Sequence, residues 1–293
     1  MHRATPTDGS FRQRLTAAVE RTNSLVCVGL DPDPARLPAH LGAERDVAAA
    51  IVRFNAAIID ATRDIVCAYK PNLGFYAAHG LAGISALEQT RRMMPPDALV
   101  ILDAKVGDMA TTSEAYARGY FDHWGFDALT VNPYQGDEAL APFLSRPGRG
   151  VFVLCKTSNR RSGDVQDLRV TSGAGELPLH LTIARQVATW AADAAASVGL
   201  VVGATYPADL AAIRAQTPDL PILLPGVGAQ GGDVEASVTA GVMEDGMGLI
   251  VSSSRAIIHA GEGHDFAAQA RAAAVQLRDR VNRVRQRSAA TAG

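Results

Sequence analysis

Two carboxylates and an ammonium group follow an apolar run near the middle of the chain. The run Ile101-Leu102 leads into Asp103, Lys105 and Asp108. In a strand, side chains two positions apart point to the same face, so Asp103 and Lys105 can project into one site while Asp108 follows on the next loop. Charged groups are costly to gather at the end of an apolar strand, and their placement therefore indicates chemistry.

A second lysine ends another apolar run. Lys70 closes the run 65–70, which in a sequential parallel sheet lies beside the strand that carries Asp103. Together with Asp103, Lys105 and Asp108 it then forms an array of alternating charge, in which each group is stabilised by its neighbours. The alternative is a buried salt-bridge network that only fixes the local structure. Such networks are unfavourable relative to apolar packing, so we favour the catalytic interpretation.

A glycine-rich loop late in the chain is suited to bind phosphate. Residues 226–232 read Gly-Val-Gly-Ala-Gln-Gly-Gly, with Gln230 as a side-chain amide donor, and Arg255 opens the last of the helices expected after a strand. Exposed backbone N–H groups, a helix N-terminus and a guanidinium group together form phosphate sites. A tight turn and a surface ion pair would explain the same residues without a ligand, but the pairing of loop and arginine favours phosphate.

Short apolar runs alternate with Ala-rich amphipathic segments, as is typical of a parallel sheet covered by helices. The sequence predicts eight strands, at 25–30, 65–70, 98–103, 128–132, 150–155, 200–203, 222–224 and 248–252. It predicts helices at 46–63, 83–94, 112–124, 137–144, 179–198, 207–216, 233–240 and 267–287. We therefore expect an α/β fold, a TIM (β/α)8 barrel, formed as a single domain by residues 1–293. Residues 1–22 would be an N-terminal extension or helix, and 264–293 a C-terminal helix and tail.

A TIM barrel would bring the polar residues of this chain to one face, because the loops after its strands carry the active site. The polar residues that follow other predicted strands include Asp31, Asn72, Ser158 and Arg255. A doubly wound open sheet, the structural alternative, would not place ligands after so many different strands. The connection 159–178 is long enough to be a lid over the site or a floppy insertion, and both interpretations stay open.

The composition favours a small-molecule partner. A net charge of -2 at pH 7 gives no general attraction to nucleic acid or to an anionic membrane. No apolar stretch approaches a membrane span, and the N-terminus lacks the apolar core of a signal peptide, so we expect a cytoplasmic protein. Cys27, Cys67 and Cys155 each lie in an apolar run, which predicts buried reduced thiols and neither a disulfide framework nor a zinc site.

The motifs taken together resemble the orotidine 5'-phosphate decarboxylase family, and most of all its longer bacterial branch (type 2). The resemblance rests on Asp-x-Lys-x-x-Asp at 103–108, Lys70 on the preceding strand, the loop 225–232 and Ser254-Arg255. Further matches, in the same order along the chain, are Gly29-Leu30-Asp31-Pro32-Asp33, Phe54-Asn55, the segment 70–76 that begins Lys70-Pro71-Asn72, and Leu154-Cys155-Lys156-Thr157-Ser158-Asn159. The Asp-x-Lys-x-x-Asp motif alone is shared with phosphosugar decarboxylases and synthases.

The resemblance implies a lyase that converts orotidine 5'-monophosphate to uridine 5'-monophosphate, the final step of de novo pyrimidine nucleotide biosynthesis. It implies that Lys105 protonates C6 of the pyrimidine as carbon dioxide leaves. Asp103 would lie against the substrate carboxylate, and Lys70 would hold Asp103 and the ribose hydroxyls. Asp108 would reach into the active site of a partner subunit, so the resemblance also implies a homodimer with shared active sites. Family members need neither a metal nor an organic cofactor.

The same resemblance assigns the substrate contacts. Asp31 would bind a ribose hydroxyl, Thr112 the ribose of the neighbouring subunit, and Ser158 the amide edge of the pyrimidine. Gln230 and Arg255 would bind the 5'-phosphate, and Asn72 belongs to the same substrate-binding set. The chain departs from the family at Val106-Gly107, Met109-Ala110-Thr111 and Arg160-Arg161, where a basic residue, Ile-Gly-Asn and a proline are usual.

Three rival functions can be weighed from the residues. A metal-dependent phosphosugar decarboxylase or synthase would need acidic ligands, for which Asp31 and Glu114 are candidates, but the ammonium of Lys70 would repel the metal. A Schiff-base aldolase needs a neutral lysine, which flanking carboxylates disfavour. A phosphate-ligand sensor without catalysis would need Gln230 and Arg255 but not the four alternating charges.

Overall fold

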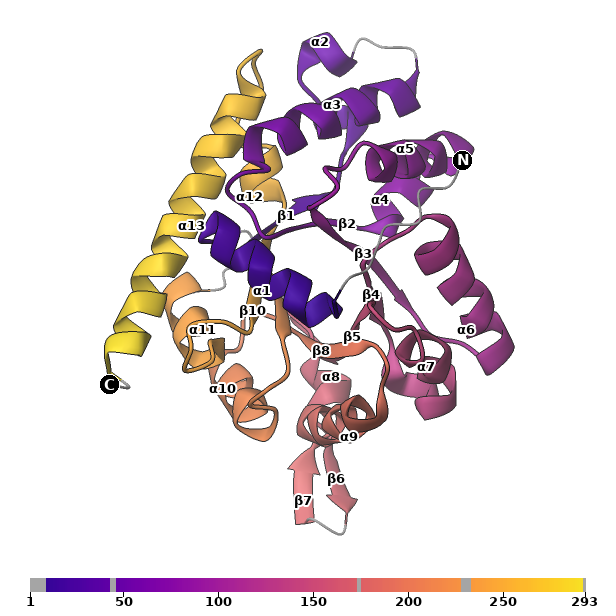
Figure 1. Ribbon diagram of the computed structural model, residues 1–293, viewed down its shortest axis with the longest axis vertical. Coiled ribbons are helices and arrows are strands. Elements are labelled where there is room, and N and C mark those ends of the chain that lie inside the picture. The colour runs from indigo at the N-terminus through magenta and orange to yellow at the C-terminus, as the bar shows by residue number, and fades with distance from the viewer. Residues whose placement is uncertain (1–8, 43–45, 173–174, 228–232, 292–293) are drawn as a thin grey trace.

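The computed structural model describes residues 9–42, 46–172, 175–227 and 233–291 (Figure 1). Eight parallel strands close into a barrel in the order β1-β10-β9-β8-β5-β4-β3-β2. They are β1 (Val26–Leu30), β2 (Ala68–Pro71), β3 (Leu99–Val106), β4 (Ala128–Val131), β5 (Gly150–Lys156), β8 (Ser197–Val202), β9 (Ile222–Pro225) and β10 (Leu249–Ser253). The predicted TIM barrel is confirmed.

The barrel strands are apolar on both faces because helices cover the outside and side chains fill the inside. All five residues of β1 are buried, as are the four residues of β4 and the five of β10. The barrel closes where Val26 of β1 pairs with Val251 of β10. The charged side chains of Lys70 and Lys105 lie at or near the carboxyl ends of their strands.

Helices surround the barrel (Figure 1). The longer ones are α1 (Phe11–Thr22), α3 (Val47–Thr62), α5 (Gly80–Arg92), α6 (Ala110–Ala117), α7 (Asp137–Leu144), α9 (Leu179–Asp193), α10 (Pro207–Gln216), α11 (Val234–Gly241) and α13 (Phe266–Thr291). Single turns are α2 (Ala39–Gly42), α4 (Leu73–Ala77), α8 (Gly163–Gln166) and α12 (Arg255–Ile258). A π-helix at Arg118–His123 extends α6, and 3-10 turns lie at Pro34–Arg36 and Pro133–Gln135.

Helix α1 lies across the end of the barrel at which the strands begin (Figure 1). Ser10 caps it in a capping box with Gln13. Phe11 is fully buried, and its ring meets the ring of Phe152 edge-on at 5.8 Å between centroids. Helix α1 thus covers part of this end, whereas the loops that follow the strands lie at the opposite end.

Several predicted boundaries were wrong. The third strand was expected to end at Asp103 but continues to Val106. The helix expected over 179–198 ends at Asp193, because Ala194 has extended backbone angles and the strand β8 already begins at Ser197. The predicted sixth strand, 200–203, thus begins three residues too late.

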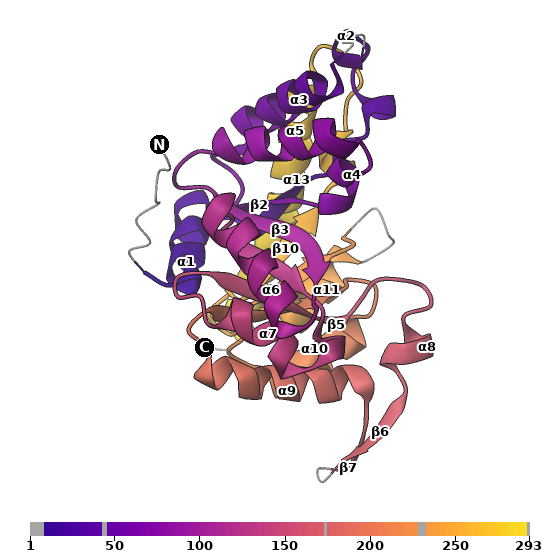
Figure 2. The same cartoon turned by 90° about the vertical axis from the view of Figure 1, so that its right-hand side faces the viewer.

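The long connection after β5 contains an element that the sequence analysis did not predict. After α8 the chain forms an antiparallel hairpin of β6 (Arg169–Ser172) and β7 (Gly175–Pro178). The hairpin extends away from the barrel (Figure 2). No helix in the described ranges is long and apolar enough to cross a membrane.

Candidate active site

A cavity of about 500 Å³ opens where the barrel strands end. Its walls come from the ends of all eight barrel strands and from loops that follow them, which is why residues far apart in the sequence meet there. Seven of the residues proposed from the sequence line it, namely Asp31, Lys70, Asn72, Asp103, Lys105, Ser158 and Arg255.

Asp103 is the centre of the polar network in this cavity. Its Oδ2 atom accepts hydrogen bonds from Lys70 Nζ at 2.9 Å and from Asn72 Nδ2 at 3.2 Å. Its Oδ1 atom accepts from Lys105 Nζ at 2.5 Å and from the Thr130 hydroxyl at 2.9 Å. Four donors on three neighbouring strands and their loops thus fix one carboxylate in both position and orientation.

This network controls the charge of Asp103. Burial alone would raise the pKa of the carboxyl group, but the ammonium groups of Lys70 and Lys105 outweigh burial and hold the pKa well below its usual range. Burial opposes the charge of Lys70 in the same way, and the attraction of Asp103 and Asp31 raises the Lys70 pKa above its usual range. Asp103 and Lys70 are therefore an ionised pair.

Lys105 is presented to the cavity by an irregular end of β3. Its φ angle is 50°, one of two positive values among the described non-glycine residues, and the pairing of β3 with β4 shifts between Leu102 and Val106. The Lys105 N–H donates to the Thr130 hydroxyl at 3.0 Å. The side chain of Lys105 is 44% exposed, compared with 5% for Lys70. Lys105 is therefore the more exposed of the two ammonium groups that line the cavity.

Asp31 and Asn72 join the first two strand ends. The backbone N–H of Asn72 donates to Asp31 Oδ1 at 3.1 Å, and Asp31 is 9% exposed. Asn72 also caps α4 by accepting a hydrogen bond from the Gly74 N–H. Because its amide also donates to Asp103, Asn72 organises the site as well as lining it.

Arg255 and Ser158 lie on other sides of the cavity. Arg255 is the first residue of α12 and is exposed. The preceding Ser254 packs closely on Gly29, where a Cβ atom would fall 1.7 Å from the serine oxygen. Ser158 follows β5 and rests on Gly203 in the same way, with its backbone nitrogen 2.6 Å from where a Cβ would lie. Both contacts require glycine for steric reasons.

Two predicted site residues that the structure describes, Asp108 and Thr112, do not line this cavity. Asp108 is half-buried beyond it, with its carboxylate accepting from the Met109 N–H at 2.7 Å and its own N–H donating to Ser113. Thr112 lies in the first turn of α6. Gln230 lies outside the described residues.

Sequence reasoning missed Thr130. It is 1% exposed in the otherwise apolar β4, donates to Asp103 and accepts from the Lys105 backbone. The sequence does show a single hydroxyl residue in this apolar strand. The register of β4 against β3 is needed, however, to show that the hydroxyl faces Asp103. Other residues that line the cavity, and that the sequence did not single out as site residues, include Asp33, Arg36, Phe75 and His259.

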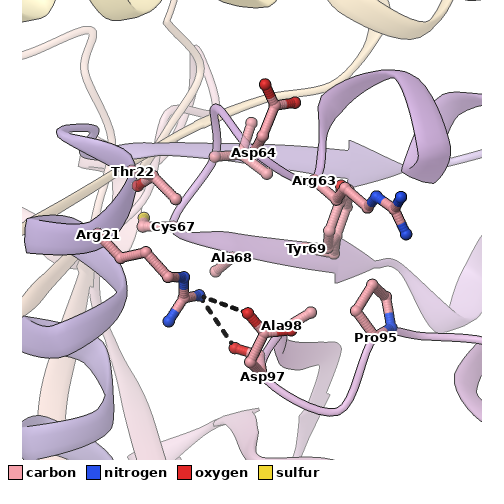
Figure 3. Close-up of a pocket in the computed structure, with 11 residues that line it drawn as sticks. Arg21, Thr22, Arg63, Asp64, Cys67, Ala68, Tyr69, Pro95, Asp97 and Ala98 are labelled. Atoms are coloured by element: carbon pink, nitrogen blue, oxygen red, sulfur yellow. Dashed lines mark hydrogen bonds and ion pairs between the residues drawn. The ribbon is translucent and has the colours of Figure 1, made fainter.

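A second cavity of about 390 Å³ lies at the opposite end of the barrel, where β2 and β3 begin (Figure 3). Arg21 and Asp97, 3.4 Å apart, form an ion pair on its wall. The carboxylate of Asp64 is paired with Arg271, whose guanidinium group donates to both carboxylate oxygens. With these charges paired at the surface, and the apolar starts of two strands as its floor, this cavity offers no comparable chemistry.

Asp31 and Glu114, the candidate metal ligands of a phosphosugar enzyme, do not line the same cavity. Glu114 pairs with Arg146 at 2.5 Å and does not line the site cavity, whereas Asp31 does. Within the described part of the chain, one group of acidic and histidine side chains has spacing suitable for a metal, namely Asp167, His180 and Asp209. None of the three lines the site cavity.

Comparisons with known proteins agree on one family. The model of the family described as "Orotidine 5'-phosphate decarboxylase / HUMPS family" matches residues 24–271. A relative named orotidine 5'-phosphate decarboxylase, from Thermomicrobium roseum, is 54% identical over 284 residues, which are 97% of this chain and 99% of the relative. Another of that name, from an Azoarcus species, is 49% identical over 94% of this chain and 99% of its own length. The solved structure of Leishmania donovani OMP decarboxylase matches with a TM-score of 0.81 and 39% identity, covering 94% of this chain and 99% of that one.

Proposed function

Because the chain belongs to the orotidine 5'-phosphate decarboxylase / HUMPS family, we propose that it decarboxylates orotidine 5'-monophosphate to uridine 5'-monophosphate in pyrimidine biosynthesis. The observation that carries this proposal is the position of Asp103, held between the ammonium groups of Lys70 and Lys105 at the open end of the barrel. A cofactor-independent route is consistent with these groups, since they supply both the electrostatic stabilisation and the proton.

The reaction breaks the bond between C6 and the carboxylate carbon and leaves the electron pair on C6. Asp103 repels the substrate carboxylate in the ground state, and this repulsion disappears as neutral carbon dioxide departs. The ammonium of Lys105 stabilises the developing carbanion and then transfers a proton from Nζ to C6. Lys105 regains a proton from solvent. Its 44% exposed side chain supports this step.

The remaining residues would hold the substrate. We assign Asp31, Lys70 and Asn72 to the ribose end of the cavity, Ser158 to the amide edge of the pyrimidine, and Arg255 with Gln230 to the 5'-phosphate. Asp31, Lys70 and Asn72 lie within one connected network. Binding energy from the phosphate, remote from C6, would be used to order the charged groups.

We further propose a homodimer in which Asp108 and Thr112 enter the partner's site. Large apolar side chains are exposed on the loops and helices after β2, β3 and β4, on the side of the barrel that carries Asp108. They are Phe75, Leu81, Met109, Tyr116 and Tyr134, of which Leu81 is 90% and Tyr134 87% exposed. Such a surface is typical of a protein interface. We also propose a cytoplasmic location, which three buried, unpaired cysteines support.

The deciding experiment follows the absorbance of orotidine 5'-monophosphate after addition of purified protein in EDTA, with the product identified by mass spectrometry. We expect rapid conversion to uridine 5'-monophosphate. The variant Lys105→Ala should lose at least about a thousand-fold in kcat, because it lacks both the acid and the fixed cation. It should still bind uridine 5'-monophosphate in calorimetry. No conversion in EDTA, with activity on a keto-sugar phosphate and magnesium, would assign the chain to the phosphosugar branch.

A further inference from the structure

A third lysine is buried outside the proposed reaction. Lys156 is the last residue of β5, and its side chain is 1% exposed. Its Nζ atom donates a hydrogen bond to Asp167 Oδ1 and lies 3.7 Å from Asp209 Oδ2. It also lies 4.8 Å from the centre of the Tyr206 ring. An ammonium this deeply buried is stable only because carboxylates and a ring face surround it.

Lys156 lies beside a group of side chains with the spacing of a metal site. Asp167, His180 and Asp209 have the spacing of a metal site, but the ammonium already contacts both carboxylates. His180 completes the group, with Nδ1 3.1 Å from Asp167 Oδ1 and 2.9 Å from the Gln166 carbonyl oxygen. The cluster is thus a complete structural unit with a built-in cation.

The cluster fastens the loop after β5 to the barrel. Asp167 follows α8 in that loop, whereas Lys156 belongs to the barrel and His180 to α9. The adjacent Gln166 strengthens the closure, since its side-chain oxygen accepts from the Thr157 N–H at 2.9 Å and its amide donates to the Thr157 hydroxyl at 3.1 Å.

The residues held by this closure lead directly into the site. Thr157, Ser158 and Asn159 follow Lys156 and line the cavity. The Lys156 carbonyl accepts from the Gly203 N–H at 2.7 Å, and Gly203 supports the backbone of Ser158 from behind. The Tyr206 hydroxyl donates to the Asn159 carbonyl at 3.3 Å. Ser158 is therefore fixed between the barrel on one side and the loop closure on the other.

We propose that Lys156 is a positioning residue that, by binding Asp167, holds Ser158 where it reads the pyrimidine edge. This inference rests on the proposed function, because it assigns Ser158 to that edge. Lys156 touches neither the substrate nor the reacting atoms. Its loss should affect recognition of the base and leave the proton transfer at Lys105 in place.

The test uses Lys156→Met, Asp167→Asn and the double variant. Each single change should raise KM for orotidine 5'-monophosphate by about tenfold with a much smaller change in kcat, because base recognition weakens while the charged array stays intact. The double variant should be no worse than the poorer single variant, since both remove one shared interaction. Affinity for ribose 5-phosphate, which has no base, should be unchanged in calorimetry.

A second measurement reports on the loop without activity. Trypsin should cleave after Arg160 or Arg161 faster in the variants than in the wild type, because the loop is released. Glu176→Gln is the matched control, since it breaks an exposed ion pair with Arg169 at 4.0 Å in the same connection and leaves the sequence around Arg160 and Arg161 unchanged. It should change neither KM nor the cleavage rate.

The outcomes separate the two proposals. Asp167 is half exposed, so Asp167→Asn keeps the test available if Lys156→Met does not fold. Wild-type decarboxylation with an unchanged KM in the variants, even at lower thermal stability, would overturn the positioning role alone. A wild-type protein without decarboxylase activity would overturn both proposals.

Discussion

At the scale of single residues, Asp103 determines the geometry of the site because all its acceptor positions are used. Two lysines, an asparagine and a threonine donate to it. A carboxylate with this many donors can neither rotate nor take up a proton easily. A substrate bound in this cavity would therefore meet a charge that is already in place, which is the condition for electrostatic preorganisation.

Thr130→Val tests how much of that preorganisation depends on a neutral hydroxyl. We expect kcat to fall about tenfold, as expected for the loss of one hydrogen bond to a charged group. Thr62→Val is the matched control, because Thr62 is also buried and its hydroxyl donates to the Ile58 carbonyl at 2.7 Å. Thr62 does not line the site cavity. The control should lower the melting temperature with no change in kcat. Equal kcat values in the two variants would show that the Thr130 hydroxyl does not contribute to catalysis.

The lowered pKa of Asp103 predicts a specific pH dependence of stability. A carboxyl group whose pKa is lower in the folded state stabilises the fold above its unfolded pKa, near 3.8, and loses this contribution as pH falls toward the folded value. The difference in unfolding free energy between wild type and Asp103→Asn should thus be constant from about pH 5 to 8 and change below about pH 4. Urea unfolding at several pH values measures it. A change already complete at pH 5 would contradict an ionised, paired Asp103.

At the scale of elements, glycines at strand ends let polar loops approach closely. Gly203→Ala would place a methyl group 2.6 Å from the Ser158 backbone nitrogen, a contact that only a backbone shift can relieve. We expect KM to rise about tenfold with little change in kcat, since Lys105 is on another strand. Gly119→Ala, where no atom lies within 4 Å of the added carbon, is the control and should leave both constants unchanged. Steady-state kinetics decide between them.

The sequence was sufficient for the barrel strands because apolar runs mark them clearly. It was insufficient for the hairpin of β6 and β7, whose four-residue strands mix polar and apolar residues, exposed and half-buried, and so carry no apolar run. The helix over 179–198 was predicted too long because Ala194-Ala195-Ala196 favour helix locally, while tertiary pairing begins a strand at Ser197.

The residues of the site were likewise predictable only in part. Asp103 and Lys105 were identified from their spacing, which needs no tertiary information. Thr130 could not be identified, because its role depends on the register of β4 against β3 and on the irregular backbone at Lys105. The role of Lys156 depends in turn on where a loop returns, which spacing along the chain does not encode.

At the scale of the whole molecule, the proposed dimer predicts complementation between inactive variants. Lys105→Ala and Asp108→Ala each damage every site of their own homodimer. If Asp108 acts in the partner's site, a mixed dimer contains one site with both residues intact. After unfolding and refolding of an equal mixture, about a quarter of wild-type activity should return.

The control for complementation mixes Lys105→Ala with Asp103→Ala. Both residues belong to one subunit's network, 2.5 Å apart, so no site of a mixed dimer is intact. This mixture should stay inactive. Recovery in neither mixture, with a monomer in analytical ultracentrifugation, would reject the shared site.

The closure of the barrel between β1 and β10 also bears on how the protein is made. Val26 finds its partner Val251 only after almost the entire chain has left the ribosome. Until then the growing sheet has two open edges, at which strands of other nascent chains can pair. Arg255, the proposed phosphate ligand, is synthesised only two residues after β10 ends. A chain that stalls during translation before this point therefore has neither a closed barrel nor a complete site, so activity can first arise only when synthesis is nearly finished.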